Sequence, residues 1–175
     1  MAEHVDPYLS TEQIAVEVAR MGGEIRDRFD GDQPLVLICV LKGSIVFFAD
    51  LLRQLHVPTH VAFLGVASYE GTHSTGAVRL THDLGMDIGG RDCIIVEDIV
   101  DTGLTMSYLL ENLKSRRPRT LRVCTLLHKP EREQVKVPMD FVGFTIDDHF
   151  VVGYGLDYEQ RYRDLDHIGV LRFTD

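Results

Sequence analysis

The chain has 175 residues, of which 45% are hydrophobic and 26% are charged, and this composition is typical of one globular domain with a well-packed core. The formal net charge of -9 argues against a nucleic-acid-binding surface, because such domains usually carry a basic face. No apolar run approaches the roughly 20 residues that cross a bilayer, and no basic stretch followed by an apolar region opens the chain. We therefore expect no membrane contact and a cytoplasmic location.

The first predicted element is an amphipathic helix. Ser10 and Gln13 have the spacing of a capping box. Hydrophobic residues then recur at helical spacing: Ile14, Val18, Met21, Ile25 and Phe29. A buried strand over Leu35–Leu41 follows, and a second helix runs to about Leu55, because Pro58 cannot continue it.

The next segment predicts two strands separated by a loop. Val61–Ala67 is expected to form a strand, and residues 68–76 hold Gly, Ser, Thr and His without periodicity, which is typical of an exposed, mobile loop. Ala77–Thr81 is a candidate for a returning strand, before a turn marked by Gly85, Gly89 and Gly90. His56 and His60 have the spacing of a metal pair, but Pro58 lies between them, so we expect no metal there.

The most informative segment is the apolar strand Cys93–Val96, which runs directly into Glu97 and Asp98. A run of this kind is typical of a strand buried on both faces of a parallel sheet. The two acids are then expected at its carboxyl end, where open α/β sheets bind ligands. Adjacent carboxylates repel each other unless a divalent cation or a sugar diol faces them.

A small, hydroxyl-rich turn follows the acids and opens a helix. Asp101, Thr102, Gly103 and Thr105 form the turn, and the helix continues through Met106, Leu109, Leu110 and Leu113. The unpaired amides at a helix start and the positive end of its dipole favour an anion such as a monophosphate. Alternatively, Asp101 or Thr102 only caps the helix beside a solvated loop, but the two acids on the preceding strand weaken that interpretation.

The remaining elements complete an α/β pattern. Leu121–Leu127 predicts a buried strand that ends at His128 and Lys129, and shorter strands are expected at Phe141–Ile146, Phe150–Val152 and Ile168–Phe173. Strands that alternate with helices imply a parallel sheet with right-handed crossovers. Three cysteines lie in apolar runs without C-x-x-C spacing and are expected to be buried, reduced thiols: Cys39, Cys93 and Cys124.

The strand, the two acids and the phosphate turn together resemble the phosphoribosyl pyrophosphate (PRPP) signature of the type I phosphoribosyltransferases. The resemblance implies that family's fold, with a central, mainly parallel sheet flanked by helices and a small, irregular C-terminal hood. We expect one such domain over residues 1–175, with a base-recognition hood mainly from about 129–175. Glu97 and Asp98 would hold the ribose hydroxyls, directly or through metal and water. The monophosphate would be held by Asp101, Thr102, Gly103, Leu104 and Thr105.

Two further loops are similar to loops of this family. Leu41, Lys42 and Gly43 stand where the family binds pyrophosphate, although without the resemblance the favoured interpretation of Lys42 is a lysine that extends to solvent beside a turn. Ser68 and Tyr69 are similar to the Ser-Tyr pair with which the family closes its active site, and a lid would keep water from a cationic ribose centre. Without the resemblance, these two residues also fit an exposed hairpin tip.

The last third of the chain resembles the hypoxanthine-guanine phosphoribosyltransferases, in which a Lys-Pro pair and a Phe-Val-Val-Gly-Tyr segment build the purine pocket. This likeness gives Lys129 the purine 6-oxo group, Phe150 the stacking face and the Val151 backbone further base contacts. Asp157 would help to hold magnesium, and Arg163 would reach pyrophosphate. An ammonium group meets the exocyclic amine of adenine as donor against donor, so adenine should be rejected.

The implied reaction is a Mg²⁺-dependent displacement of pyrophosphate from PRPP by a purine, which yields IMP or GMP. Glu97, Asp98 and Asp157 are the expected metal ligands, and Asp101 is expected to exchange a proton with N7 of the base. Two alternatives stay open: a xanthine-preferring phosphoribosyltransferase, and a PRPP-sensing regulator on the same fold. Members of the family are commonly homodimers or homotetramers, and we expect one of these states.

Two positions depart from the family pattern. Leu104 stands in the phosphate loop where several relatives carry a basic or polar residue, so a cation is lost while the loop amides remain. His149 precedes Phe150 where a lysine is common, which changes the charge at the edge of the pocket and bears on base preference.

Overall fold

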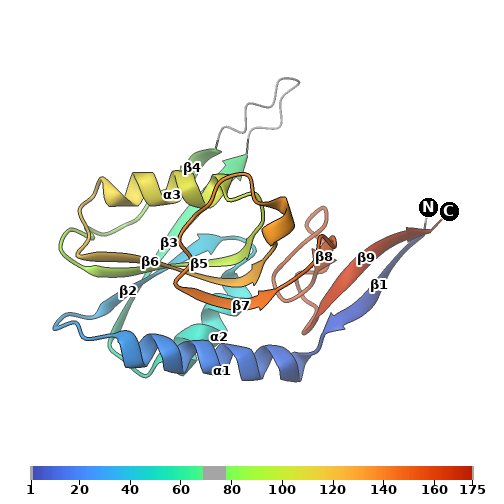
Figure 1. The fold of residues 1–175 in the computed structure, drawn as a ribbon, viewed down its shortest axis with the longest axis horizontal. Coiled ribbons are helices and arrows are strands. Elements are labelled where there is room, and N and C mark those ends of the chain that lie inside the picture. The colour runs from blue at the N-terminus through green and yellow to red at the C-terminus, as the bar shows by residue number, and fades with distance from the viewer. Residues whose placement is uncertain (1, 69–77, 175) are drawn as a thin grey trace.

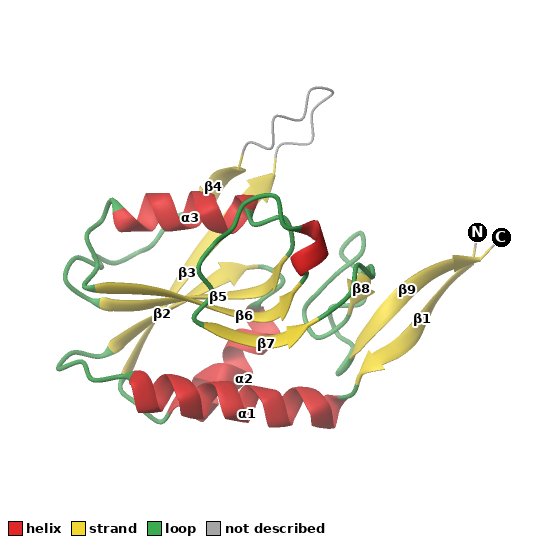
Figure 2. Ribbon diagram, viewed as in Figure 1, coloured by secondary structure: helices red, strands yellow, loops and turns green. Residues whose placement is uncertain are grey.

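The computed structural model describes residues 2–68 and 78–174 (Figure 1). Within these ranges, a six-stranded sheet with the order β4-β3-β2-β5-β6-β7 forms the centre of the molecule (Figure 2). Its strands are β2 (Leu35–Leu41), β3 (Thr59–Ser68), β4 (Val78–His82), β5 (Asp92–Val100), β6 (Thr120–His128) and β7 (Phe141–Thr145). All neighbouring pairs are parallel except β3 and β4. The predicted α/β fold with a mainly parallel sheet is confirmed.

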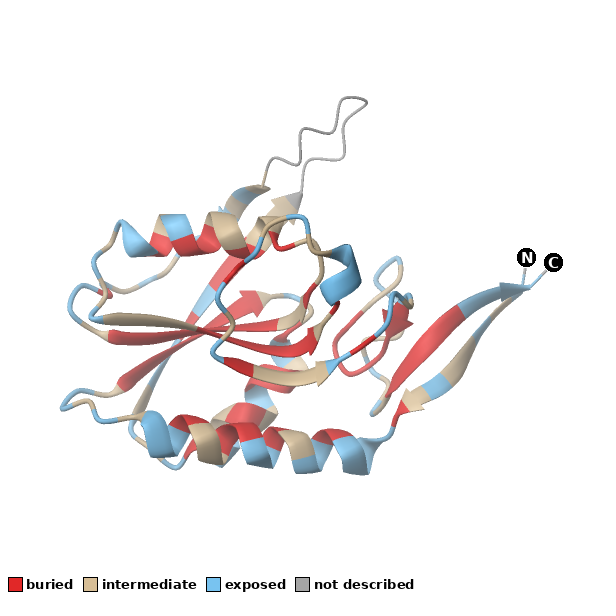
Figure 3. Ribbon diagram, viewed as in Figure 1, coloured by how far each residue is buried: buried red, intermediate tan, exposed pale blue. Residues whose placement is uncertain are grey.

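Helices cover both faces of this sheet (Figure 1). Helices α1 (Thr11–Arg28) and α2 (Ile45–Leu55) lie on one face, and α3 (Leu104–Lys114) lies on the other. Side chains of a strand alternate between faces, so β2 contributes to two cores. The core beneath α1 and α2 contains Leu35, Leu37 and Cys39, and the core beneath α3 contains Val36, Ile38 and Val40. In Figure 3, the stretches of α1 and α3 coloured as buried lie on the side of each helix next to the sheet.

The predicted helix starts and ends are largely confirmed. Ser10 Oγ accepts a hydrogen bond from the Gln13 amide, and Gln13 Oε1 accepts one from the Ser10 amide, so the capping box at α1 is present. Phe29 caps the end of α1 and lies just outside the helix. Helix α2 ends at Leu55, and the φ of 52° at the cap residue His56 turns the chain away before Pro58.

A second sheet forms the hood, with the order β1-β9-β8. It pairs β1 (Ala2–Leu9) with β9 (Ile168–Thr174), and β9 with β8 (Val151–Val152), all antiparallel. The two chain ends therefore lie side by side (Figure 1). The base-recognition hood over about 129–175 stays a prediction, and the second sheet differs from that range in two strands. The hood includes β1, which the sequence analysis did not predict, while β7 belongs to the central sheet because it pairs with β6.

Strand β5 is longer than predicted. Glu97, Ile99 and Val100 continue the ladder with β6, so the acid pair lies within the second half of the strand and not beyond its end. The predicted loop at 68–76 falls almost entirely outside the described residues, as does Tyr69. Ser68 is the last residue of β3, and β4 returns antiparallel beside it.

The cysteine prediction is confirmed, since Cys39, Cys93 and Cys124 are free and buried. Within the described ranges, no helix combines the length and the apolar character that a membrane span requires.

Candidate active site

The two acids of β5 line different pockets. Successive residues of a strand point to opposite faces of the sheet. Glu97 lines a pocket of about 260 Å³ together with the turn at the start of α3, from Asp101 to Gly103. Asp98 lines a pocket of about 270 Å³ that opens toward the hood. Asp101 lines both pockets and so lies where the two cavities meet.

Burial makes the acid pair costly while it is ionised. The side chain of Glu97 is buried, and burial followed by the neighbouring charge of Asp98 raises its pKa well above the ordinary value. Burial also raises the pKa of Asp98, although its own hydrogen bonds and the charge of Arg163 oppose that shift. No lysine or arginine of the described residues forms an ion pair with either carboxylate. The pair is therefore suited to a divalent cation that lies outside the chain itself.

The turn that precedes α3 is fixed by its backbone. Gly103 has a φ of 80°, and a Cβ atom at this position would overlap the carbonyl oxygen of Val135. The carbonyl oxygen of Thr102 accepts hydrogen bonds from the amides of Gln134 at 3.0 Å and Val135 at 3.1 Å. Helix α3 has no side-chain cap at Gly103. The Leu104 amide donates to Thr102 Oγ1 at 3.4 Å. Among the described residues, no side chain accepts from the next two amides of this helix, which are thus available to an anion in the adjoining pocket.

The loop after β2 touches the acid pair. Strands β2 and β5 are parallel neighbours, so the loop that follows β2 lies near the acids at the end of β5. A Cβ atom on Gly43 would overlap the carboxylate of Asp98, and a Cβ atom on Gly155 would overlap the carbonyl oxygen of Gly43. Residues 41–43, β5 and the hood therefore meet at one point. Leu41 is half-buried there, and Lys42 is exposed.

The pocket beside Asp98 brings the predicted base-binding residues together. Its wall includes Asp98, Asp101, Lys129, Phe150, Val151 and Asp157. Lys129 is 6% exposed although it carries a charge, whereas Phe150 is 52% exposed although it is apolar. A buried ammonium group and an exposed ring in one cavity are the reverse of ordinary core packing and indicate a ligand site.

The Phe150 ring is held by a neighbouring aromatic residue that the sequence analysis did not consider. Tyr158 packs against it edge-on, with ring centroids 5.7 Å apart, and also contacts the ring of Phe173 at 5.5 Å. Arg161 lies over the Tyr158 ring and forms an ion pair with Glu3 of β1 at 2.8 Å. Strand β1 thereby supports the wall of the pocket.

Asp157 and Arg163 face each other at the hood side of the pocket. Arg163 forms an ion pair with Asp157 at 2.7 Å and donates a hydrogen bond to the carbonyl oxygen of Gly155 at 2.7 Å. Asp157 also accepts a hydrogen bond from the Gln160 amide at 2.8 Å. The predicted metal ligand Asp157 is thus already partnered, and it shares a pocket with Asp98 but not with Glu97.

Arg132 and Asp148 are two further charged residues at this pocket that the sequence analysis did not find. Arg132 Nε donates a hydrogen bond to Asp101 Oδ1 at 3.2 Å, and Asp148 contacts both Arg132 and Lys129 at 3.6 Å. Arg132 ends the short 3₁₀ helix η1 (Pro130–Arg132), and Asp148 lies between β7 and β8. The nearby Lys129-Pro130 pair was the only available signal.

The donor set fits Mg²⁺ in chemistry and in number. Carboxylate oxygens are the protein ligands that Mg²⁺ prefers, and it commonly takes only one or two of them, with water and substrate phosphate completing its shell. Glu97 is buried, Asp98 is half-buried, and neither has a cationic partner in the described residues. No cluster of three or more histidine, cysteine or acidic residues suited to a metal is found in that part of the chain.

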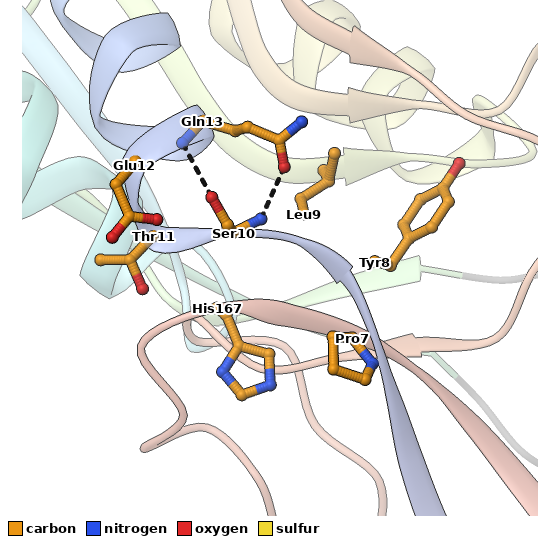
Figure 4. A pocket seen from close by; sticks show the side chains of 8 residues that line it. All are labelled: Pro7, Tyr8, Leu9, Ser10, Thr11, Glu12, Gln13 and His167. Carbon is orange, nitrogen blue, oxygen red and sulfur yellow. Dashed lines mark hydrogen bonds between the residues drawn. The ribbon is translucent and has the colours of Figure 1, made fainter.

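Another pocket, of about 330 Å³, lies where β1 meets α1 (Figure 4). It contains none of the predicted site residues. Ser10 and Gln13, which line it, use their polar atoms for the capping box (Figure 4). Nδ1 of His167 on its wall lies 3.0 Å from Asp166 Oδ1. We do not include this pocket in the candidate site.

Comparisons with known proteins agree with this geometry. A family model described as the phosphoribosyl transferase domain matches residues 4–159. The chain is 52% identical over 169 residues to a hypoxanthine-guanine phosphoribosyltransferase of Mycobacterium avium, an alignment that covers 93% of this chain and 83% of that protein.

Two solved structures are also similar. A hypoxanthine-guanine phosphoribosyltransferase from Bacillus anthracis has a TM-score of 0.91 and 38% identity, over 98% of this chain and 100% of that one. A hypoxanthine phosphoribosyltransferase from Trypanosoma cruzi, in complex with the product IMP, has a TM-score of 0.89 and 42% identity, over 95% and 93% of the two chains.

Proposed function

The chain belongs to the phosphoribosyltransferase family, and from this membership we propose that it transfers the phosphoribosyl group of PRPP to hypoxanthine or guanine. The products are IMP or GMP and pyrophosphate, and the role is purine salvage. The observation that carries the proposal is the pocket that Asp98, Asp101, Lys129 and Phe150 line together. It contains a buried cation, an exposed aromatic face and an acid, which are the groups that a 6-oxopurine needs.

The purine lies against Phe150 in this proposal. Stacking on an aromatic face binds any base, so the selection must come from hydrogen bonds. The Lys129 ammonium donates to the 6-oxo group, and the Val151 backbone provides further contacts to the base. An adenine amine in the same place would leave the buried ammonium without an acceptor, and that loss is the basis for rejecting adenine.

PRPP occupies the edge of the sheet beside the purine. Its monophosphate binds the turn from Asp101 to Thr105, where Gly103 provides no side-chain cap and the amides that follow Leu104 face no side-chain acceptor among the described residues. The phosphate contacts depend on these amides, so Leu104 in the turn does not weaken them. Its pyrophosphate lies against residues 41–43 and Arg163. This arrangement is supported by the meeting of Gly43, Asp98 and Gly155 at one point.

Mg²⁺ is the proposed cofactor, with Glu97 and Asp98 as its protein ligands, directly or through water, and with Asp157 near a second ion. The ion would neutralise charge on the leaving pyrophosphate. Its binding would also relieve the repulsion between the two neighbouring acids of β5. Asp157 needs to loosen its ion pair with Arg163 to act as a ligand.

Asp101 is the proposed catalytic residue. It lies between the phosphate turn and the base pocket, so its carboxylate can take the N7 proton while another ring nitrogen attacks C1 of the ribose. The positive charge that develops on the ribose is then close to the carboxylate of Asp98. Ser68 and Tyr69 are proposed to begin the lid over this centre, which would exclude water from it.

We also propose a cytoplasmic homo-oligomer of two or four copies. Three free, buried cysteines support a reducing compartment. Val61 and Phe63 lie on one face of β3 and are 40% and 38% exposed, which supports an apolar contact between copies. Size-exclusion chromatography with light scattering checks this state directly.

A turnover assay with PRPP tests the function. Hypoxanthine, guanine, xanthine and adenine are compared with Mg²⁺ and with a chelator. We expect Mg²⁺-dependent nucleotide formation from hypoxanthine or guanine and none from adenine. A clear preference for xanthine would replace the proposed substrate. PRPP binding without turnover of any base would instead identify a PRPP-sensing regulator.

A further inference from the structure

Four charged side chains form a continuous chain of alternating sign along one edge of the base pocket. Asp101 Oδ1 accepts a hydrogen bond from Arg132 Nε at 3.2 Å. Arg132 Nη1 lies 3.6 Å from Asp148 Oδ2, and Asp148 Oδ1 lies 3.6 Å from Lys129 Nζ. We propose that Arg132 and Asp148 are positioning residues, which hold the proton acceptor Asp101 and the 6-oxo donor Lys129 at the spacing of the purine O6 and N7 atoms. This inference rests on the proposed function and adds two residues to it.

The chemistry of the base explains why such a chain is useful. O6 and N7 are neighbouring atoms on one edge of a 6-oxopurine, and they need opposite partners, a donor for O6 and a proton acceptor for N7. An ammonium group and a carboxylate placed side by side would pair with each other and leave the base unbound. Here Arg132 and Asp148 lie between the two groups in the row of charged side chains. Lys129 is paired with Asp148 and Asp101 is paired with Arg132, so Lys129 and Asp101 do not pair with each other.

The backbone alone does not fix these two groups. Lys129 follows β6 and donates its amide to the carbonyl oxygen of Val100 at 3.0 Å, so the ends of β5 and β6 are joined next to Asp101. The Lys129 ammonium, however, is four carbons away from its backbone, and side chains of this kind lose much rotamer freedom when they are held. Asp148 and Arg132 supply that restraint before the base arrives.

The hydrogen bond to Arg132 occupies only one oxygen of Asp101. Among the described residues, no donor contacts Oδ2, so this oxygen is available to the N7 proton. A carboxylate that is oriented by one partner while it serves another is the usual arrangement of a positioned base. Replacing Arg132 would leave Asp101 in the pocket but would remove the restraint on its direction.

The solvent exposure of these side chains distinguishes a positioning role from a role in folding stability. The side chain of Arg132 is 48% exposed, and those of Asp101 and Asp148 are 36% and 45% exposed. Ion pairs this accessible to solvent add little to folding stability. A variant of Arg132 should therefore fold normally, and a large loss of turnover would then report on positioning.

A double-mutant cycle in the full-length protein tests the inference. Arg132→Gln is expected to lower kcat for hypoxanthine by about 10- to 100-fold, because the Asp101 carboxylate, although still present, would no longer point at the N7 proton. The KM for PRPP and the thermal midpoint should barely change. In an Asp101→Asn background, Arg132→Gln should cause little further loss, because Arg132 acts through Asp101. Arg132→Lys, which keeps the charge, should recover part of the rate.

Arg172→Gln is the matched control. Arg172 pairs with Asp6 at 2.8 Å between β9 and β1, is 56% exposed and lies outside the base pocket. It should leave kcat unchanged.

Two outcomes would overturn the inference while the wild type stays active. In one, Arg132→Gln leaves kcat at the wild-type value. In the other, its effect is as large with Asn at position 101 as with Asp. Wild-type protein that fails to turn over any base would contradict the proposed function as well, and the same assay shows which of the two has failed.

Discussion

Replacing Glu97 by Gln should stabilise the protein while it abolishes its activity. Glu97 is a buried acid beside the half-buried acid Asp98, and no described cation pairs with it. Gln has nearly the same shape, carries no charge, and its amide can donate to the carboxylate of Asp98. The proposed metal site would lose one of its ligands. Stability and activity should therefore change in opposite directions.

The size of the gain follows from the unpaired buried charge. Removing such a charge without leaving a cavity commonly stabilises a protein by about 1–2 kcal/mol. For a chain of this length, about 1 kcal/mol raises the thermal midpoint by about 2–4 °C, so we expect an increase of about 2–8 °C near pH 8 without magnesium.

The sign of the pH dependence is fixed by the direction of the shift. Burial and the charge of Asp98 raise the pKa of Glu97 in the folded protein, so the folded state binds this proton more tightly than the unfolded chain. Ionised Glu97 lowers the free energy of unfolding, and this loss appears as the pH rises above the ordinary glutamate pKa of 4.5. As the pH falls below that value, the cost disappears. The difference between variant and wild type should therefore grow with pH.

Thermal melts from pH 4 to 9, with and without Mg²⁺ and PRPP, provide the measurement. The ligands should raise the midpoint of the wild type, because at a hundredfold excess over Kd they add about 2.7 kcal/mol to the free energy of unfolding. They should leave the midpoint of Glu97→Gln unchanged. Glu111→Gln on the exposed face of α3 is the control and should match the wild type. A variant that melts below the wild type at pH 8 would refute the reasoning.

Three further predictions concern the pocket. Gly43→Ala should lower turnover by more than about 100-fold, because its Cβ overlaps the Asp98 carboxylate, whereas Gly85→Ala has open space and should be silent; equal rates for both variants would contradict this. Lys129→Gln should lower kcat/KM for hypoxanthine by about 100-fold and reduce the ratio of kcat/KM for hypoxanthine to that for adenine. Parallel assays on both bases measure this ratio, and an unchanged ratio would argue against the 6-oxo contact. Phe150→Leu should raise the KM for hypoxanthine by about 10-fold through lost stacking but leave the KM for PRPP unchanged, and a change in the PRPP constant alone would count against the stacking role.

Local patterns in the sequence were enough to predict most of the elements. The capping box of Ser10 and Gln13 specifies the start of α1, and the apolar run before Glu97 specifies β5. Both signals lie within a few residues of the feature they predict. The convergence of Lys129 with the acids was also predictable, because neighbouring parallel strands end at one edge of the sheet.

The features that were missed depend on distant contacts. Strand β1 contains Pro7 and lacks a clear alternation, and its pairing partner β9 lies at the other end of the chain. Arg132 lies 31 residues from Asp101, at the end of the short 3₁₀ helix η1, so no period links the two. The end of β5 was misplaced because the ladder with β6, and not hydrophobicity, extends the strand through the acids.

The most direct test of the account is a crystal structure with IMP and Mg²⁺. The account predicts O6 within about 2.7–3.2 Å of Lys129 Nζ, the ring stacked on Phe150, and N7 facing Asp101. A base that lies elsewhere, or a Lys129 side chain directed away from O6, would contradict it.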